Sequence, residues 1–182
     1  MRTNFTPFPK LSTDRLSLRQ LSDEDTQEIF SIRSDENIAK YLDRPKANSA
    51  DDARAFINKI NAGIPKGEWV YWAIIPKDKS KLIGTICLWK ISEEYSKAEI
   101  GFELLPQFQG KGFMQEALTA VLDFGFNVMN LKSIEGEVDP NNDRSIKILE
   151  KNKFVKIINL GENIDQDGTV LNTVVYSLSN KS

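Results

Sequence analysis

The chain has 182 residues, of which 40% are hydrophobic and 27% charged, and its formal net charge is −2. A chain of this length can bury most of its unfolded surface in one core, so we expect a single domain over residues 1–182. The slightly negative charge excludes a chain-wide electrostatic match to nucleic acid or to an anionic membrane, and no apolar run is long enough to span a bilayer.

The chain contains no histidine and one cysteine, Cys87. The lack of histidine removes the Ser-His-Asp and Cys-His nucleophile systems and most zinc sites, so we expect no metal. Proton transfers would have to use carboxylates, hydroxyls, lysine, tyrosine or water. Cys87 lies between Ile86 and Leu88 in an apolar run, which favours a buried thiol over a nucleophile. The N-terminal residues lack the apolar core of a signal peptide, which predicts a cytoplasmic protein.

The first half of the chain predicts a strand, two helices and three more strands. Alternating polar and apolar residues predict the first strand at residues 15–19. Two Ser-x-x-Asp spacings, typical of helix N-caps, predict helices that begin after Ser22 and Ser49, the second of which ends near Gly63. Apolar runs then predict strands at residues 70–75, 81–91 and 98–105.

The second half of the chain predicts alternating helices and strands. A long amphipathic helix is expected over residues 111–127. Its predicted buried residues are Met114, Leu118, Val121, Leu122 and Gly125. The elements that follow are a strand at 133–138, a helix at 143–151, and strands at 154–160 and 170–178 with hairpin-turn residues at 165–168 between them. This order indicates an α/β protein with a mixed sheet.

The segment Gly110-Lys111-Gly112 lies between a predicted strand and the long helix. The first turn of a helix leaves backbone N–H groups unpaired at its positive end, and glycines allow a ligand to approach them closely. Such a turn can hold a diphosphate without a metal. A plain strand-to-helix connection without a ligand has the same pattern. The segment is not a P-loop, and Gln115 stands where a dinucleotide fingerprint has its third glycine.

Here the sequence resembles a known family. Gln107-x-x-Gly110-x-Gly112 is similar to the Gln/Arg-x-x-Gly-x-Gly/Ala signature of the GNAT (Gcn5-related) N-acetyltransferases. Further segments follow the ribosomal-protein N-acetyltransferase-like (RimJ/RimL-type) branch in order, at residues 11–19, 71–74, 83–86, 98–104, 116–118, 142–145 and 149–154. The resemblance implies a single-domain α/β GNAT fold. Its sheet is mixed and mostly antiparallel, with about seven strands splayed in the middle and about four flanking helices.

The resemblance implies that acetyl-CoA, as cosubstrate, lies in the gap where the sheet splays. The backbone around Phe102 and Leu104 would pair with the pantetheine arm, and the amides from Gln109 to Phe113 would hold the diphosphate. Asn142 matches a position that contacts the pantetheine arm, and Lys147 is a candidate for the phosphates. The implied cofactor-binding residues are Phe102, Leu104, Gln109, Gly110, Lys111, Gly112, Phe113, Asn142 and Lys147.

Three residues are candidates for the acetyl-transfer chemistry. Glu99 and Glu103 share one face of a predicted strand, and Glu99 matches a position where some GNAT enzymes carry their general base. Either carboxylate could instead bind the amine or face solvent. Many family members place a tyrosine acid where this chain has Leu149, so the resemblance leaves Ser145 as the candidate acid.

The resemblance also shows one departure near the C-terminus of the 143–151 helix. Lys153 stands where the family usually has glycine before Phe154. We expect a left-handed helix cap to move onto Asn152, because asparagine tolerates that conformation.

The acceptor and the activity are less constrained by the sequence. Between Asp14 and Asp52 there are ten acidic and six basic residues. That excess suits a cationic amine, although solubility and helix caps explain it equally well. The resemblance implies a protein N-terminus or a small-molecule amine as acceptor and allows a homodimer. Two other classes stay open: a catalytically silent acyl-CoA-binding module, and a nucleotide-binding or redox protein.

Overall fold

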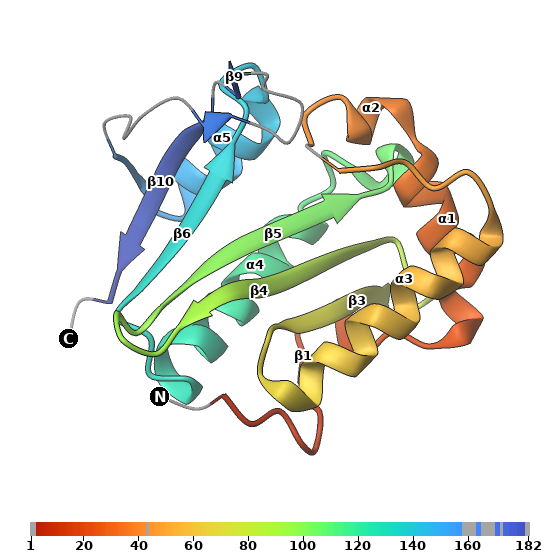
Figure 1. Ribbon diagram of the computed structural model, residues 1–182, viewed down its shortest axis with the longest axis horizontal. Helices are drawn as coiled ribbons and strands as arrows, with labels where there is room; N and C mark the ends of the chain where they lie inside the picture. Colours follow the sequence, from red (N-terminus) through yellow and green to blue (C-terminus); the bar gives the residue numbers. More distant parts are fainter. Residues whose placement is uncertain (1–2, 43, 158–162, 165–169, 172, 181–182) are drawn as a thin grey trace.

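The computed structural model describes residues 3–42, 44–157, 163–164, 170–171 and 173–180 (Figure 1). Its strands are β1 (Leu11–Ser12), β2 (Leu16–Arg19), β3 (Val70–Pro76), β4 (Gly84–Ser92), β5 (Lys97–Leu104), β6 (Ser133–Val138), β7 (Val155–Lys156), β8 (Asn163–Ile164), β9 (Val170–Leu171) and β10 (Val174–Ser179). Its α-helices are α1 (Thr26–Ser34), α2 (Glu36–Ala39), α3 (Ala50–Gly63), α4 (Phe113–Asp123) and α5 (Asp143–Lys151). The predicted hairpin turn at 165–168 lies outside the described residues, apart from its flanks.

Eight strands form one sheet in the order β1-β2-β3-β4-β5-β6-β10-β7, and β8 pairs with β9 in a separate sheet. All neighbouring strands are antiparallel apart from β5 and β6, which are parallel. The predicted fold class, α/β with a mixed and mostly antiparallel sheet, is confirmed. The main sheet has one strand more than the seven expected, and the described part of the chain contains five α-helices where four were expected.

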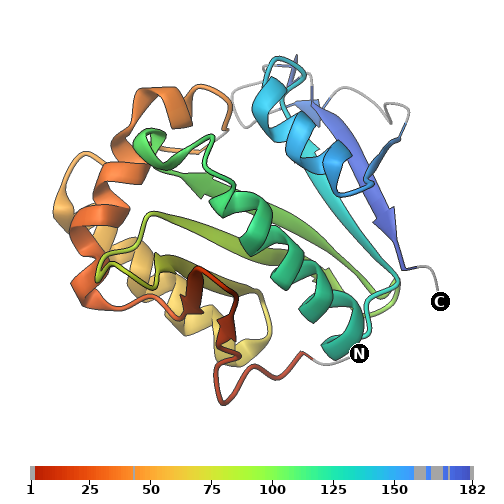
Figure 2. The ribbon, with the colours of Figure 1, turned by 180° about the vertical axis from the view of Figure 1, so that it is seen from behind.

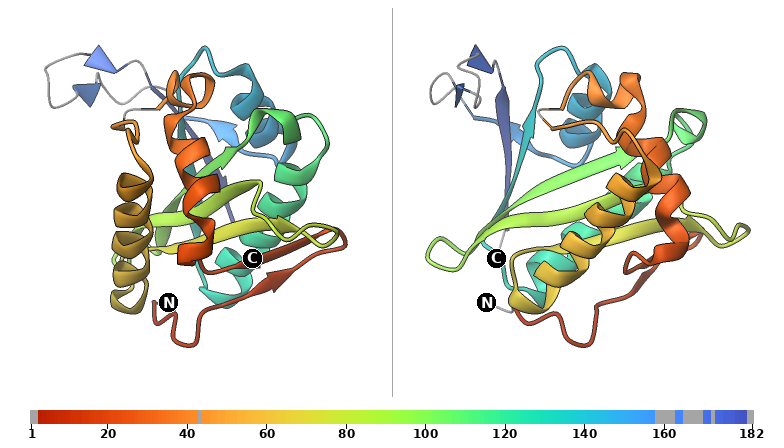
Figure 3. Two further views of the ribbon diagram at one scale, coloured as in Figure 1. Left: turned by 90° about the vertical axis from the view of Figure 1, so that its right-hand side faces the viewer. Right: turned by 45° about the vertical axis from the view of Figure 1, so that its right-hand side comes forward.

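The sheet splays between β5 and β6. The two strands pair only at the positions of Lys97, Ala98 and Glu99, and they separate beyond Glu99. Figure 3 shows the two strands meeting at one end and diverging toward the other. The far half of β5 therefore has one backbone edge that no strand of the described residues covers.

Helices cover both faces of the sheet. Helix α4 lies across one face, as Figure 2 shows from behind, and α3 crosses the opposite face over β3 with α1 packed against it. The predicted buried side of α4 is confirmed, because Met114, Leu118 and Val121 are buried. The predicted helix continues past α4 as a π turn at Phe124–Val128, where the Phe124 ring packs edge-on against Trp72.

The C-terminus of α5 differs from the prediction. The left-handed residue is Lys153, with φ of 66°, whereas Asn152 has φ of −91°. The Asn152 side chain makes two hydrogen bonds with Gln115, at 2.7 and 3.0 Å, and donates to the Ile148 carbonyl at 2.7 Å. Because these bonds hold Asn152 in a right-handed conformation, the left-handed position falls on the next residue, and the expectation for Asn152 was wrong.

Replacing Lys153 with glycine is expected to raise the free energy of unfolding by about 1 kcal/mol, because a left-handed conformation costs a non-glycine residue roughly 1–2 kcal/mol. In a chain of this size that corresponds to a rise of about 2–4 °C in Tm. Thermal unfolding followed by circular dichroism measures the change. Lys151→Gly, at the last helical residue of α5, is the control and should lower the Tm; an unchanged or lower Tm for Lys153→Gly contradicts the prediction.

Candidate functional site

The predicted glycine turn joins β5 to α4. A 3₁₀ turn at Pro106–Phe108 leads out of the strand, and Gly110 and Gly112 follow with left-handed φ values of 74° and 79°. Other residues rarely adopt this conformation, so the chain needs glycine at both positions. The turn ends at Phe113, the first residue of α4.

The turn presents a row of backbone donors. Within the part of the chain that the structure describes, the backbone N–H groups of residues 110–115 have no acceptor, and the first bonded amide is that of Glu116, which donates to Gly112 at 3.1 Å. The positive end of the α4 dipole adds to these donors. The Gln109 amide is not part of the row, because it donates to Pro106 at 3.2 Å. The geometry is that of an anion cradle.

Arg15, which lies between β1 and β2, binds the turn to this end of the sheet. Its guanidinium donates to the Lys111 carbonyl at 3.0 Å, pairs with Glu116 at 2.7 Å and lies 4.6 Å above the Phe113 ring. Burial raises the pKa of Glu116, but hydrogen bonds from Thr13 and Arg15 outweigh it and lower that pKa overall. The carboxylate is therefore charged at neutral pH and holds the arginine in place. Sequence reasoning noted Arg15 only as part of a family motif.

The open edge of β5 lies beside this turn. Leu105 donates to the carbonyl of Ile83, the residue before β4, and residues along an antiparallel strand alternate in the side toward which their backbone groups point. The backbone groups of Phe102 and Leu104 therefore point away from β4, into the gap. Gln109 marks the same gap, because its side chain donates to the Leu104 carbonyl at 2.8 Å and accepts a hydrogen bond from Arg144 on α5. The glutamine thus bridges the two sides of the splay.

Helix α5 borders the other side of the gap. Asn142 caps the helix by accepting a hydrogen bond from the Ser145 amide at 3.2 Å, and the half-buried Ser145 hydroxyl has no hydrogen-bond partner among the described residues. Lys147 is exposed. Leu149 is buried in the core and leaves that position without a proton donor. Of these α5 residues, Ser145 has a hydroxyl that is not used in holding the helix.

Glu99 lies on the face of β5 opposite α4. Its carboxylate pairs with Lys90 at 2.8 Å, and the same ammonium is 3.6 Å from Glu137 on β6. Burial raises the pKa of Glu99, and the Lys90 ammonium opposes that shift without cancelling it. A carboxylate with a raised pKa is a stronger base than an exposed glutamate. Glu99 thus has the chemical character expected of a general base.

Glu103 lies four residues further along the same face. Its carboxylate is buried and accepts a hydrogen bond from the Arg44 Nε at 2.8 Å. Burial raises the pKa of Glu103, while Arg44 and Arg33 oppose that shift. Arg44 also donates to the Arg33 and Ile32 carbonyls, at 3.2 and 3.4 Å. Glu103 is therefore held in a network that ties the α2–α3 connection to the sheet.

Gly101 separates the two glutamates and places no side chain on this face between them, a position called the Gly101 notch below. A Cβ at Gly101 would lie 3.2 Å from the Cys87 Sγ and 3.7 Å from the Trp89 Nε1. Cys87 is half-buried where the sequence predicted a buried thiol, and burial raises the pKa of this thiol. The Trp89 indole and the Cys87 thiol border the notch, and Glu99 and Glu103 lie two residues away from it in either direction along β5.

No described helix is both long enough and apolar enough to cross a membrane. No group of three or more histidine, cysteine, aspartate or glutamate side chains is placed to hold a metal ion in the described ranges.

Comparisons with known proteins agree with this geometry. Residues 15–155 match the family model described as an acetyltransferase (GNAT) domain. An uncharacterized N-acetyltransferase of Bacillus subtilis, YoaA, is 33% identical over 171 residues, which cover 94% of this chain and 97% of the relative. The ribosomal protein uS5-alanine N-acetyltransferase of Escherichia coli is 23% identical and covers 82% of this chain and 80% of its own length.

A solved structure shares the fold. The spermidine N-acetyltransferase of Vibrio cholerae, in complex with CoA and spermine, superimposes with a TM-score of 0.78 at 25% identity and covers 92% of this chain and 96% of its own. The family model spans most of the chain, from the β2 strand to β7, and includes the glycine turn and the open edge of β5. The chain therefore belongs to the GNAT family of N-acetyltransferases.

Proposed function

We propose that this chain binds acetyl-CoA in the gap between β5 and β6 and transfers the acetyl group to a primary amine. The observation that carries the proposal is the row of unbonded amides at residues 110–115, which follows the open edge of β5 after the short connection at residues 105–109. The amides suit the diphosphate, and the strand edge suits the amide-containing pantetheine arm, which can pair with it like an added strand.

The residues around the gap can each serve one part of the reaction. The amine must be neutral to attack the thioester carbon, and an α-amine with a pKa of about 7.7–8.0 loses its proton more readily than a lysine. Glu99 accepts the proton of the attacking nitrogen, directly or through water. The N–H groups of Phe102 and Leu104 lie where they can stabilise the negative charge that develops on the thioester oxygen. As the C–S bond breaks, Ser145 donates a proton to the thiolate sulfur.

Glu99 is a better candidate base than Glu103. Both carboxylates are largely buried, but Glu103 is bound by a guanidinium that also holds two backbone carbonyls. Glu99 is bound by Lys90, whose ammonium lies at the end of a half-exposed side chain that an incoming amine can displace. We therefore assign Glu99 to proton transfer. We assign Glu103 to a structural role, in which it binds the α2–α3 connection to the sheet through Arg44.

The test of this proposal has two parts. Thermal-shift assays with CoA, NAD and ATP separate an acyl-CoA protein from a nucleotide-binding or redox protein, because only the first is stabilised by CoA alone. Release of free thiol from acetyl-CoA, measured over N-terminal peptides and small amines, then separates an enzyme from a catalytically silent module. Stabilisation by NAD or ATP without CoA would overturn the proposal.

A matched pair of variants tests the role of Arg15. Replacing Arg15 with glutamine removes the bonds to Lys111 and Glu116 and is expected to weaken CoA binding about 3- to 10-fold, since a hydrogen bond of this kind contributes roughly 1 kcal/mol. Calorimetric titration with CoA measures the change. Arg54→Gln, which removes an exposed arginine paired with Asp51 on α3, should bind CoA like the wild type. Equal affinities for both variants would show that Arg15 does not position the turn.

A further inference from the structure

Two arginines face one carboxylate on the exposed side of β5. Arg44 is fully engaged, since it pairs with Glu103 and donates to two backbone carbonyls. Arg33, from α1, lies near the same carboxylate. Unlike Arg44, it makes no ion pair with that carboxylate. These three side chains therefore carry a net positive charge on the face where an acceptor would bind.

The Arg33 guanidinium is positioned by an aromatic ring, but it has no hydrogen-bond acceptor among the described residues. It stacks at 3.9 Å on the ring of Phe56, a residue of α3. Among the described residues, none accepts a hydrogen bond from this guanidinium or pairs with it as a carboxylate. Burial lowers the pKa of Arg33, and the neighbouring Arg44 lowers it further. A half-buried guanidinium in this setting gains from an anion that supplies the missing acceptors.

The Phe56 ring under Arg33 is packed against its neighbours. The Phe56 ring packs edge-on against Tyr71 with centroids 5.8 Å apart, and the Tyr71 hydroxyl is 3.1 Å from the Thr85 hydroxyl on β4. Burial raises the pKa of Tyr71, so its hydroxyl is neutral. Arg33 is thus held by aromatic packing at a fixed place beside β4 and β5, and it does not depend on an acidic partner for its position.

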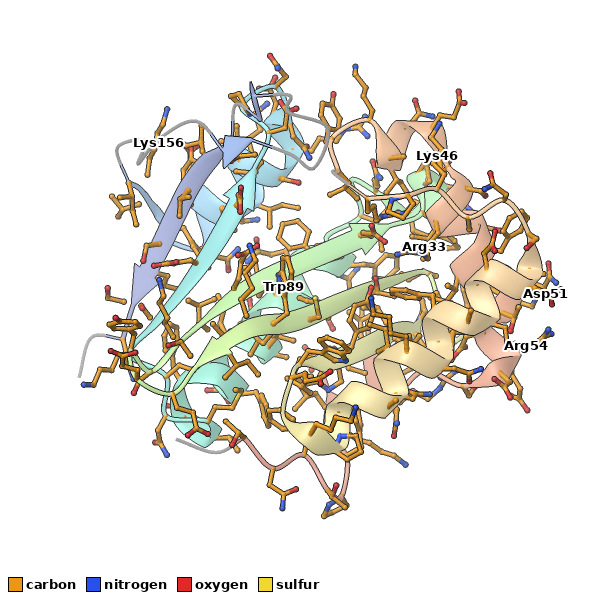
Figure 4. The ribbon with its side chains drawn as sticks, in the orientation of Figure 1. Arg33, Lys46, Asp51, Arg54, Trp89 and Lys156 are labelled. Carbon is orange, nitrogen blue, oxygen red and sulfur yellow. The ribbon has the colours of Figure 1, made fainter. Side chains whose placement is uncertain are left out.

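A second donor without an acceptor lies on the same face. The indole N–H groups of Trp69 and Trp72 donate to backbone carbonyls, but that of Trp89 has no acceptor in the described part of the chain. It lies against the notch at Gly101. Figure 4 shows Trp89 along the middle of β4 and β5 and Arg33 nearer the far end of β5. Trp89 is the cross-strand partner of Glu99, so its N–H group lies at the Glu99 end of this face, whereas Arg33 lies near Glu103.

The acidic residues of the N-terminal region do not reverse this charge. Asp25 pairs with Arg19, Asp52 caps α3, and Asp51 pairs with Arg54 on the surface. Glu28 pairs with Lys81, Asp35 caps α2 and Glu36 pairs with Lys46, so six of the ten acidic residues between Asp14 and Asp52 are engaged in structural roles. A second ammonium near Arg33 and Arg44 would be repelled.

We infer that the acceptor is a primary amine that also carries a carboxylate, with its nitrogen over the Gly101 notch beside Glu99 and its carboxylate on Arg33. This inference rests on the proposed acetyl transfer. Glu99 and Glu103 are about 13 Å apart along the strand, so an amine beside Glu99 and a carboxylate on Arg33, near Glu103, belong to an acceptor in which several bonds separate the two groups. The carboxylate comes either from a free amino acid or from an acidic residue next to a protein N-terminus.

The experiment compares acceptors that differ only in charge. Thiol release is measured with ω-amino acids of two to six carbons and their carboxamides, and with N-terminal peptides that begin Ala-Glu or Ala-Gln; spermidine is the polycationic comparison. For at least one pair, the wild-type kcat/KM should be about tenfold or more higher for the carboxylate than for the carboxamide. The difference should lie in KM, because the guanidinium–carboxylate bond that the carboxamide lacks is charge-assisted. The pair that responds identifies the source.

Variants then locate the effect. Arg33→Gln should abolish the preference by raising the KM for the carboxylate acceptor while leaving the KM for its carboxamide unchanged, and Arg33→Lys should keep part of it. Arg54→Gln is the matched control and should behave like the wild type. Equal wild-type activity on both members of every pair, or a preference for spermidine, overturns the inference even if a variant folds poorly.

Binding distinguishes failure of the inference from failure of the proposed function. The same acceptor pairs are titrated by calorimetry into the protein saturated with CoA, which requires no turnover. If the protein binds CoA but binds the carboxylate and the carboxamide with equal affinity, only the inference is contradicted. If the protein does not bind CoA, both the proposed function and this inference are contradicted.

Discussion

Replacing Glu99 with glutamine is expected to lower kcat by about 10²- to 10⁴-fold, the range typical of a lost general base, while the affinity for CoA stays unchanged. Glutamine keeps the shape of the side chain and loses its ability to accept a proton. Burial raises the pKa of Glu99, so the base is unprotonated only above that raised value. The wild-type rate should therefore rise with pH through the titration of Glu99, and deprotonation of the amine adds a second rise.

Two further variants make the Glu99 result interpretable. Glu135→Gln removes a carboxylate that pairs with Lys97 at 3.2 Å and lies opposite Glu99 in the β5–β6 register, so it changes the local charge but not the proposed base. It should retain most of the wild-type kcat. In steady-state kinetics over pH 5 to 9, the rate of Glu99→Gln should lack the first rise with pH, the one that comes from the titration of Glu99. Full turnover by Glu99→Gln with an unchanged pH profile would remove Glu99 from the mechanism.

Glu103→Gln should act on stability. It removes the charged partner of Arg44, and a buried ion pair that loses one member costs roughly 3–5 kcal/mol. Because the side chains of this pair retain some exposure to solvent, at 15% and 11%, we expect the lower end of that range. If the loss of stability, measured as the fall in Tm, does not account for the whole fall in kcat, Glu103 is again a candidate base.

Replacing Gly110 with alanine is expected to weaken CoA binding at least about tenfold. A Cβ at Gly110 would meet no protein atom within 4 Å, so the added methyl group projects into the space where the diphosphate is proposed to lie. The left-handed φ of 74° adds backbone strain of roughly 1–2 kcal/mol, which tends to move the neighbouring amides. The loss of affinity therefore has two sources that act in the same direction.

Gly67 offers a matched control for Gly110. It has the same φ of 74°, at the end of the turn after α3, and a Cβ there would lie 2.7 Å from the Thr3 carbonyl oxygen. Gly67→Ala should lower the Tm at least as much as Gly110→Ala and leave CoA binding intact. Calorimetry with CoA and thermal unfolding of both variants give the comparison. If Gly110→Ala binds CoA as the wild type does, the amides of this turn are not the diphosphate site.

Much of the fold follows from local patterns in the sequence. The apolar side of α4, the alternation along β5 and the bounds of β6 and α5 depend on periodicity and on capping residues, which act over one or two turns or a few strand positions. Gly110 and Gly112 were recognisable for the same reason, because a sharp turn into a helix needs left-handed residues. The family resemblance added the splay between β5 and β6, which no local pattern indicates.

The chemistry of the acceptor face was decided by the tertiary structure. Arg44 meets Glu103 across 59 positions of the chain, and Arg15 meets Glu116 across 101. Strand alternation placed Glu99 and Glu103 on one face, and the family resemblance pointed to Glu99 as the base, but the different partners of the two carboxylates were decided by the tertiary structure. The sequence by itself therefore determined the secondary structure and the glycine turn, where neighbouring residues settle the backbone. The pairing of distant charges, and with it the roles of Arg33, Glu99 and Glu103, depended on how the helices pack onto the sheet, because a charge pair forms only where the chain's topology brings both side chains together.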